Sequence, residues 1–342
     1  MSEKLFLIDA MAVIYRAYFA MIGRPLKDTK GNNVSAIYGF VNSMLRIIED
    51  EKPEHIAVCF DTEKPTFRHV EFPQYKAQRA EIPDDMPWQI NEVKDIVKLY
   101  NIPMIELPGF EADDIIGTLV KQAEKEGVIS YMVTPDKDYM QLVSDKSFIF
   151  KPSKTSTGNK GDMEVVGIEG VKIKFGVEPE KVIEVLGLMG DTADNIPGVK
   201  GVGEKTATAL IQEYGSIDGI YKNIDNIKKP KLKEILIKDK DNAYLAKRLV
   251  TIKTDVPLHI NFHNLTMKEP NREELYKRFE ELNMKSFARK YSSGLKFGEP
   301  VEAIKSSDAE DDDVSLKITI QGNKIEEPEE EVKTIKDVKH DY

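Results

Sequence analysis

The sequence of 342 residues contains a single cysteine, Cys59. One thiol excludes an internal disulfide and a thiolate metal cluster, and its apolar neighbours indicate an unreactive core residue. The sequence also lacks an apolar run of the ~20 residues that span a membrane. Its first residues, MSEKLFLIDA, lack the pattern of a signal peptide. We therefore expect a soluble, cytoplasmic protein.

Basic charge is not in excess, because the net charge is −10. Taken alone, this charge argues against a nucleic-acid partner. Residues 299–342, however, hold fourteen Asp and Glu against six Lys, a net charge of −8, which leaves −2 for residues 1–298. We interpret 293–342 as an acidic linker or the start of a following domain, with one strand-like run, VSLKITI, at 314–320.

Short apolar or β-branched runs alternate with helical patterns in the first half of the chain. This alternation predicts an α/β fold with a parallel sheet covered by helices on both faces. The expected helices include 35–49, 87–100 and 204–214. The expected strands are 5–8, 55–60, 103–107, 130–134 and 147–150.

Acidic residues follow four of these predicted strands. Ligand sites in such sheets lie beyond the carboxyl ends of the strands, so these acids are expected at one edge. Another acidic pair lies in LMGDTADNIPGVKGVG. Each acid alone is equally well explained as an N-cap or turn residue. The nine acids are Asp9, Asp61, Glu111, Asp113, Asp114, Asp136, Asp138, Asp191 and Asp194.

The joint pattern predicts a metal site made only of oxygen ligands. Such a site selects Mg²⁺ or Mn²⁺ over zinc. Two ions about 4 Å apart can activate water and stabilise the leaving oxygen in phosphodiester cleavage. The helix start EADDIIGTLV carries three carboxylates in four positions, more than capping requires. We attribute this clustering to bound metal.

Two segments carry features suited to DNA. FRHVEFPQYKAQR contains the basic residues Arg68, Lys76 and Arg79, and Tyr75 offers a stacking face, although a solvated loop is the alternative. GVKGVGEKTATAL predicts a hairpin between two helices, whose backbone N–H groups can approach a phosphate. Candidate DNA contacts in the hairpin are Lys200, Gly201, Gly203, Lys205 and Thr206.

Five stretches resemble, in order, the motifs of the 5' nuclease domain of bacterial DNA polymerase I, within the flap endonuclease family. They are LIDAMAVIYRAYFAM, FDTEKPTFRHVEFPQYKAQR, GFEADDIIGTLV, TPDKDYMQLV and GLMGDTADNIPGVKGVGEKTATALI. The resemblance implies a PIN-like catalytic core at 1–180 with a helical arch at about 63–88. It also implies a helix-hairpin-helix (H3TH) DNA-binding subdomain at 181–292. One departure is Ala10, where the family commonly has glycine.

The resemblance also implies the activity and the roles of the residues. The activity is that of a structure-specific 5'-3' exonuclease and flap endonuclease that removes RNA primers and 5' flaps, in a nucleoid-associated polymerase. Lys76, Arg79 and Arg16 would contact the reacting phosphate, and K⁺ would bind at the hairpin turn. The first metal site would comprise Asp9, Asp61, Glu111, Asp113 and Asp114, and the second Asp136, Asp138, Asp191 and Asp194.

Two other functions compete with this interpretation. A phosphatase of the haloacid-dehalogenase type would also place an aspartate after its first strand. It needs a second aspartate two positions later, where this chain has Met11. A non-catalytic duplex-binding module would explain the hairpin and the lysines but not nine acids at one edge.

Overall fold

The computed structural model describes residues 3–153 and 163–292. The acidic segment predicted at 293–342, with its expected strand, lies outside the described residues. No helix in the described part is long and apolar enough to cross a membrane. All nine acids of the predicted site lie within the described residues.

A six-stranded sheet has the order β3-β2-β1-β4-β5-β6, in which β1 to β5 are parallel and β6 runs antiparallel to β5. The five strands predicted from sequence are confirmed. The short edge strand β6 was not predicted, because half its residues are exposed and its alternation is weak. The strands are β1 Lys4–Asp9, β2 His55–Cys59, β3 Met104–Ile105, β4 Ile129–Val133, β5 Ser147–Pro152 and β6 Met163–Val166.

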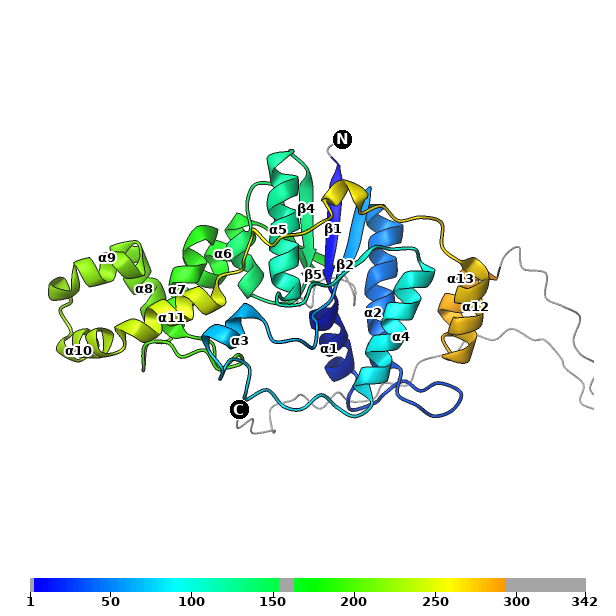
Figure 1. Ribbon diagram of the computed structural model, residues 1–342, viewed down its shortest axis with the longest axis horizontal. Coiled ribbons are helices and arrows are strands. Elements are labelled where there is room, and N and C mark those ends of the chain that lie inside the picture. The colour runs from blue at the N-terminus through cyan, green and yellow to red at the C-terminus, as the bar shows by residue number, and fades with distance from the viewer. Residues whose placement is uncertain (1–2, 154–162, 293–342) are drawn as a thin grey trace, which may run out of the picture. The chain divides into compact units, whose positions relative to one another are not determined.

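Helices cover both faces of the sheet (Figure 1). Alternate side chains of β1 point to opposite faces. Leu5 and Leu7 join the core that α5 covers, whereas Phe6 and Ile8 join the core under α1, α2 and α4. Burial on both faces explains why these strands are continuous apolar runs.

Thirteen α-helices lie in the described part of the chain, with a π-helical turn η1 (Ile47–Glu51) after α2. Four 3₁₀ turns complete the regular structure: η2 Asp138–Leu142, η3 Pro179–Lys181, η4 Ile224–Asn226 and η5 Phe262–Asn264. The α-helices are α1 Ala10–Ala20, α2 Ser35–Arg46, α3 Phe67–Glu71, α4 Met86–Leu99, α5 Ala112–Lys125, α6 Ile168–Phe175, α7 Val182–Met189, α8 Glu204–Tyr214, α9 Ile217–Lys222, α10 Pro230–Lys238, α11 Lys240–Val250, α12 Arg272–Glu281 and α13 Lys285–Tyr291.

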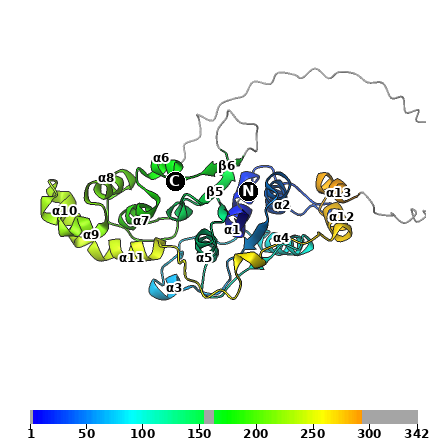
Figure 2. The same ribbon diagram turned by 90° about the horizontal axis from the view of Figure 1, so that it is seen from above.

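Helices α7 to α11 form a helical subdomain beside the sheet (Figure 2). The predicted hairpin between two helices is confirmed, since it joins α7 to α8, and α8 has the predicted bounds. Helices α12 and α13 do not join this subdomain. Phe279 and Phe287 instead pack into the core that contains α4. The predicted range 181–292 therefore includes two helices that pack on the sheet side, and its bounds stay a prediction.

The predicted helical arch at about 63–88 is helical only in part. Only α3, five residues long, is helical before α4 begins at Met86. Pro73 and Pro83 lie between them, and a proline disfavours helix at the residue before it and removes a backbone donor. We call residues 63–85 the arch segment.

Candidate active site

The carboxyl ends of separate strands bring acids to one edge of the sheet. Asp9 ends β1 in register with Cys59, and Asp61 follows β2 by two residues. The Asp61 carboxylate accepts the N–H of Ala112 at 2.7 Å, which holds the start of α5 at the same edge. The sequence prediction that these segments meet is therefore confirmed.

Asp9 is buried and held by three hydrogen bonds. One oxygen accepts from Ala12 N at 3.1 Å and so caps α1. The other accepts from Tyr139 OH at 3.0 Å and Thr134 Oγ1 at 3.2 Å. Burial, followed by repulsion from Asp61, raises the pKa of Asp9 to about 7.

Asp136, Asp138, Asp191 and Asp194 form what we call the second acidic group. Desolvation, followed by repulsion from Asp136, raises the pKa of Asp138 to about 8. Oδ1 of Asp138 is buried and has no hydrogen-bond partner in the described part of the chain. The negative charge of Asp138 is thus poorly compensated.

Lys137 is a member of the site that the sequence interpretation missed. Its Nζ lies 3.0 Å from Oδ2 of Asp191. It lies between two acids in TPDKDYMQLV, so its position inside a recognised motif was the available signal. It brings a cation to the second acidic group.

Two glycines fix the loop that carries Asp191 and Asp194. Gly190 and Gly198 approach so closely that a Cβ on either would collide with the backbone of the other. Gly190 also has a φ of +69°, which favours glycine. Asp191 and Ile196 close the loop with paired backbone hydrogen bonds at 3.0 and 2.7 Å.

In the first acidic group, which comprises Asp9, Asp61, Glu111, Asp113 and Asp114, cations surround Glu111 and Asp114. Glu111 accepts from Lys76 Nζ at 2.7 Å, Tyr75 OH at 3.0 Å and Arg68 Nη1 at 3.2 Å. Burial alone would raise the pKa of Glu111, but Lys76 and Arg68 lower it. Pairing with basic side chains therefore explains part of the clustering of carboxylates in EADD, which the sequence analysis attributed to metal alone.

Arg68 is a buried structural cation, which corrects the prediction that it contacts DNA. Its side chain is 1% exposed, and it donates to both oxygens of Asp114 at 2.7 and 2.9 Å. Its remaining donors reach the carbonyls of Leu249 and Thr251 at 2.8 and 3.1 Å. Arg68 therefore anchors the arch segment beneath α5 and the end of α11.

Asp114 is likewise enclosed by protein donors. Besides Arg68, it accepts from the backbone N–H groups of Glu111 and Lys253 at 3.2 and 2.8 Å. Its side chain is fully buried. The geometry assigns Asp114 a structural role, and the prediction that it binds metal directly gains no support from this structure.

The remaining predicted residues of the arch segment lie beside the acids. Tyr75 is 4% exposed, so it offers no stacking face, and its hydroxyl donates to Glu111 and Asp194 at 3.0 and 3.2 Å. Nη2 of Arg79 lies 2.6 Å from Oδ1 of Asp194. Lys76 adopts a left-handed φ of +59° while its N–H donates to Asp194 O at 2.9 Å. A strained residue at a charged site is a common functional feature.

The carboxylate oxygens of the nine acids lie too far apart to form a compact set of metal ligands. Within residues 3–153 and 163–292, no three of the nine carboxylates bring an oxygen each within 4.8 Å of one another. Burial, together with repulsion between neighbouring acids, instead raises the pKa values of several of them. A hard divalent cation is the species that would draw such oxygens together.

Exposed positive and aromatic side chains flank this edge. Arg16 is exposed on α1. Nearby, Tyr18 is buried and donates to Asp85 at 2.7 Å, while Phe19 is 51% exposed. Tyr18 is therefore a core residue and Phe19 remains available for contact.

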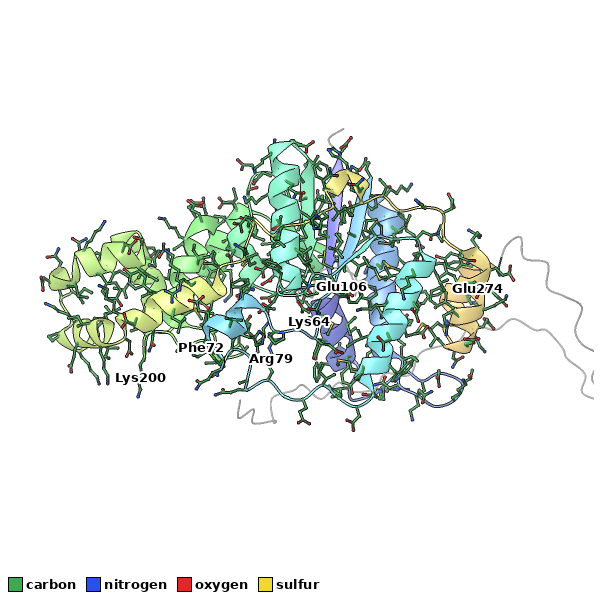
Figure 3. All side chains as sticks on the ribbon, in the orientation of Figure 1. Lys64, Phe72, Arg79, Glu106, Lys200 and Glu274 are labelled. Carbon is green, nitrogen blue, oxygen red and sulfur yellow. The ribbon has the colours of Figure 1, made fainter. Side chains whose placement is uncertain are left out.

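The glycine-rich hairpin lies across a groove from the arch segment. The groove has a volume of about 650 Å³, and Phe72, Gln78, Thr192 and Lys200 are among its lining residues. Figure 3 shows Phe72, Arg79 and Lys200 along the same side of the molecule.

Within the hairpin, a positive φ of +79° marks Gly201, and Gly203 precedes α8. Lys200 and Lys205 are exposed, and Thr206 is half-buried. Both lysines can therefore meet a ligand that enters from this side.

An acid-lined parallel sheet followed by a helical subdomain with this hairpin defines a nuclease with a resolvase-like, or PIN-like, core. Comparison with known families identifies it further. Residues 4–176 match the 5'-3' exonuclease N-terminal resolvase-like domain, and residues 177–273 match the 5'-3' exonuclease C-terminal SAM fold. The chain belongs to the 5'-3' exonuclease family.

Individual relatives agree with this assignment. A 5'-3' exonuclease of Aquifex aeolicus is 36% identical over 289 residues, which cover 84% of this chain and 94% of that protein. DNA polymerase I of Bacillus subtilis is 41% identical over 280 residues, which cover 82% of this chain and 31% of that protein. The chain spans about a third of the length of its DNA polymerase I relatives.

Solved structures share the fold. T5 5'-exonuclease with bound zinc is 21% identical, with a TM-score of 0.59 over 84% of this chain and 98% of that one. The catalytic core of Rad2 in complex with DNA is 18% identical, with a TM-score of 0.57 over 85% of this chain and 91% of that one.

Proposed function

We propose that the protein hydrolyses phosphodiester bonds in DNA with two Mg²⁺ or Mn²⁺ ions, acting as a 5'-3' exonuclease and flap endonuclease. The observation that carries this proposal is the meeting of two acidic groups with Lys76 and Arg79 at one edge of the sheet. Membership of the 5'-3' exonuclease family supports the reaction class.

The residues present fit hard divalent cations. The donors are carboxylate oxygens, without histidine or cysteine, which suits Mg²⁺ or Mn²⁺. Raised pKa values at Asp9 and Asp138, and the unpaired buried oxygen of Asp138, indicate negative charge that lacks a partner. Asp9, Asp61, Glu111 and Asp113 would hold one ion, and the second acidic group the other.

When bound, the ions supply an activated water and stabilisation of the leaving oxygen. The chain itself positions the phosphate. Lys76 and Arg79 already pair with Glu111 and Asp194, so each lies where a phosphate held against these acids would meet a positive charge. Arg16, exposed on α1, is proposed to contact the same phosphate. Their charges would stabilise the additional negative charge of the transition state.

Duplex DNA is proposed to bind along the hairpin. Lys200 and Lys205 would contact phosphates, and Gly201 and Gly203 would allow the backbone to approach them closely. Carbonyls of the turn are proposed to hold K⁺. Such contacts read the backbone and not the base sequence, which suits substrates defined by a flap, a nick or an RNA primer.

The domain division at about residue 180 also stays a proposal, and the boundary between the two family models at 176 and 177 supports it. We further propose that the chain works as part of a cytoplasmic, nucleoid-associated polymerase. The lengths of the DNA polymerase I relatives support this context.

Cleavage of an end-labelled 5'-flap duplex in Mg²⁺ tests the function. We expect wild-type protein to cut near the base of the flap and Asp136→Asn to bind the same DNA without cutting it. Binding is compared in Ca²⁺, which occupies such sites without supporting turnover. Tight binding without any cleavage by the wild type would instead identify a duplex-binding module.

A further inference from the structure

A second cluster of potential metal ligands lies at the opposite edge of the sheet. Glu3, His55 and His263 each place a ligand atom within 4.8 Å of the others, and no other trio of acidic, histidine or cysteine side chains in the described part of the chain does so. We propose that this cluster binds one Zn²⁺ or a similar transition-metal ion. The proposal is independent of the nuclease function.

Three separate parts of the chain build this cluster. Glu3 precedes β1, His55 begins β2, and His263 lies in η5. Nε2 of His55 lies 3.5 Å from Oε2 of Glu3, and the rings of His55 and His263 are 6.1 Å apart. Glu3 and His263 are about half exposed, so both side chains can close around an ion without rearrangement of the core.

The hydrogen bonding of the two imidazoles suits metal coordination. His55 is buried, and its Nδ1 has no hydrogen-bond partner in the described residues. Nε2 of His263 lies 2.8 Å from Glu126. A carboxylate on one imidazole nitrogen orients the ring and leaves the other nitrogen to bind metal, a common arrangement around zinc.

The chemistry of this cluster separates it from the acidic edge. Two imidazoles and a carboxylate favour Zn²⁺, Cu²⁺ or Ni²⁺, whereas the carboxylates at the other edge favour Mg²⁺. Strand β1 is six residues long, and a strand of this length separates the two edges by roughly 15–20 Å. An ion bound here is therefore too far away to take part in cleavage.

The ion would fasten the connection between α11 and α12 to the sheet. Figure 1 shows this yellow connection crossing the amino-terminal edge, close to the start of β1. Its backbone contact with β2 at this point is the hydrogen bond from Ile56 N to Leu265 O, at 2.7 Å. A metal ion bound by His263, His55 and Glu3 would add a second link between this connection and the sheet.

Zinc binding by the full-length protein tests the proposal. Chelator-treated protein is titrated with Zn²⁺ by calorimetry in excess Mg²⁺, and thermal unfolding is followed in parallel. We expect one Zn²⁺ to bind and to raise the unfolding temperature. His263→Ala and Glu3→Gln should each weaken binding at least about tenfold, because loss of even an indirect metal contact costs 10- to 100-fold.

Two variants serve as controls. His259→Ala removes an exposed histidine four positions away, and Asp136→Asn alters the acidic edge; both should bind Zn²⁺ like the wild type. Cu²⁺ bound to the wild type should show nitrogen hyperfine splitting in its electron paramagnetic resonance spectrum, and His263→Ala should reduce it. Unchanged Zn²⁺ binding by His263→Ala, or its loss in Asp136→Asn, would overturn the proposal.

Discussion

Glu111 and Asp138 are both partly enclosed carboxylates at the same edge, yet their environments have opposite effects. Lys76 and Arg68 lower the pKa of Glu111, whereas desolvation and Asp136 raise the pKa of Asp138 to about 8. Glu111 is thus compensated by the protein's own cations, whereas Asp138 would gain a partner only from a cation in solution. The comparison predicts different outcomes for substitutions around these two carboxylates.

The largest effect is expected in the second acidic group. Asp191→Asn should abolish detectable cleavage of a 5'-flap duplex, because a metal ion held partly by Asp191 would be misplaced. Binding of the flap duplex in Ca²⁺ should remain close to wild type. Turnover in Mg²⁺ near the wild-type rate would remove Asp191 from the proposed metal site.

Around Glu111 and Asp114, substitution of a cation should change stability first. Arg68→Met leaves the buried Asp114 without its cation and should lower the free energy of unfolding by about 3–5 kcal/mol. Urea denaturation measures this change. Arg248→Met is the matched control, since Arg248 forms a 2.6 Å pair with Glu71 while 58% exposed, and it should cost at most about 1 kcal/mol. Equal costs would show that burial of the Arg68 pair is unimportant.

Lys76 links the two behaviours, because it compensates Glu111 and also faces the proposed phosphate position. Lys76→Ala should lower kcat by about 10²–10³, the usual cost of removing a transition-state contact. Affinity for DNA in Ca²⁺ should change little. Lys94→Ala removes a lysine paired with Glu106 outside the site and should leave kcat unchanged. A change confined to KM would assign Lys76 to tethering.

The pH dependence of metal-free stability separates the groups further. A carboxyl whose pKa is raised on folding contributes stability below its unfolded pKa of 3.8, and this contribution is lost as the pH rises towards its folded pKa of about 8. Asp138→Asn should therefore gain stability relative to wild type between pH 5 and 8, by at least about 1 kcal/mol. Denaturation in chelator at both pH values measures the difference, and a constant difference would contradict the environment assigned to Asp138.

The smallest effect concerns the hairpin, which lies outside both acidic groups. Lys200→Ala or Lys205→Ala should reduce the slope of log Kobs against log salt by about one unit for flap binding in Ca²⁺. Lys98→Ala on α4 is the control and should leave the slope unchanged. Lysine variants that bind with the wild-type slope would place the duplex elsewhere.

Much of the fold could be predicted from local pattern. The apolar runs around β1, β2 and β4 are strands because both faces are buried, and Gly203 followed by an amphipathic stretch gives α8 its predicted bounds. The packing of α12 and α13 against the sheet side could not be predicted, because it depends on contacts with α4 that no local pattern records.

The acids at this edge and the neighbouring Lys76 and Arg79 could be predicted, but the burial of Arg68 could not. Asp9, Asp61 and the second acidic group lie at the expected edge. Arg68 looked exposed because a charged side chain is seldom buried. Its burial depends on Asp114, 46 residues away, and on two carbonyls near the end of α11. The residues next to Arg68 in the sequence carry no signal of partners so far along the chain, so its burial could not be predicted from local pattern.

Proton release on metal binding tests the central claim most directly. If Mg²⁺ or Mn²⁺ binds the acids whose pKa values are raised, these acids must lose their protons at a pH near 6.5. Calorimetric titration with Mn²⁺ in buffers of different ionisation enthalpy counts the protons released. We predict clear proton release by the wild type and less by Asp138→Asn. Metal binding without proton release, or equal release by both proteins, would contradict the claim that the second acidic group awaits a cation from solution.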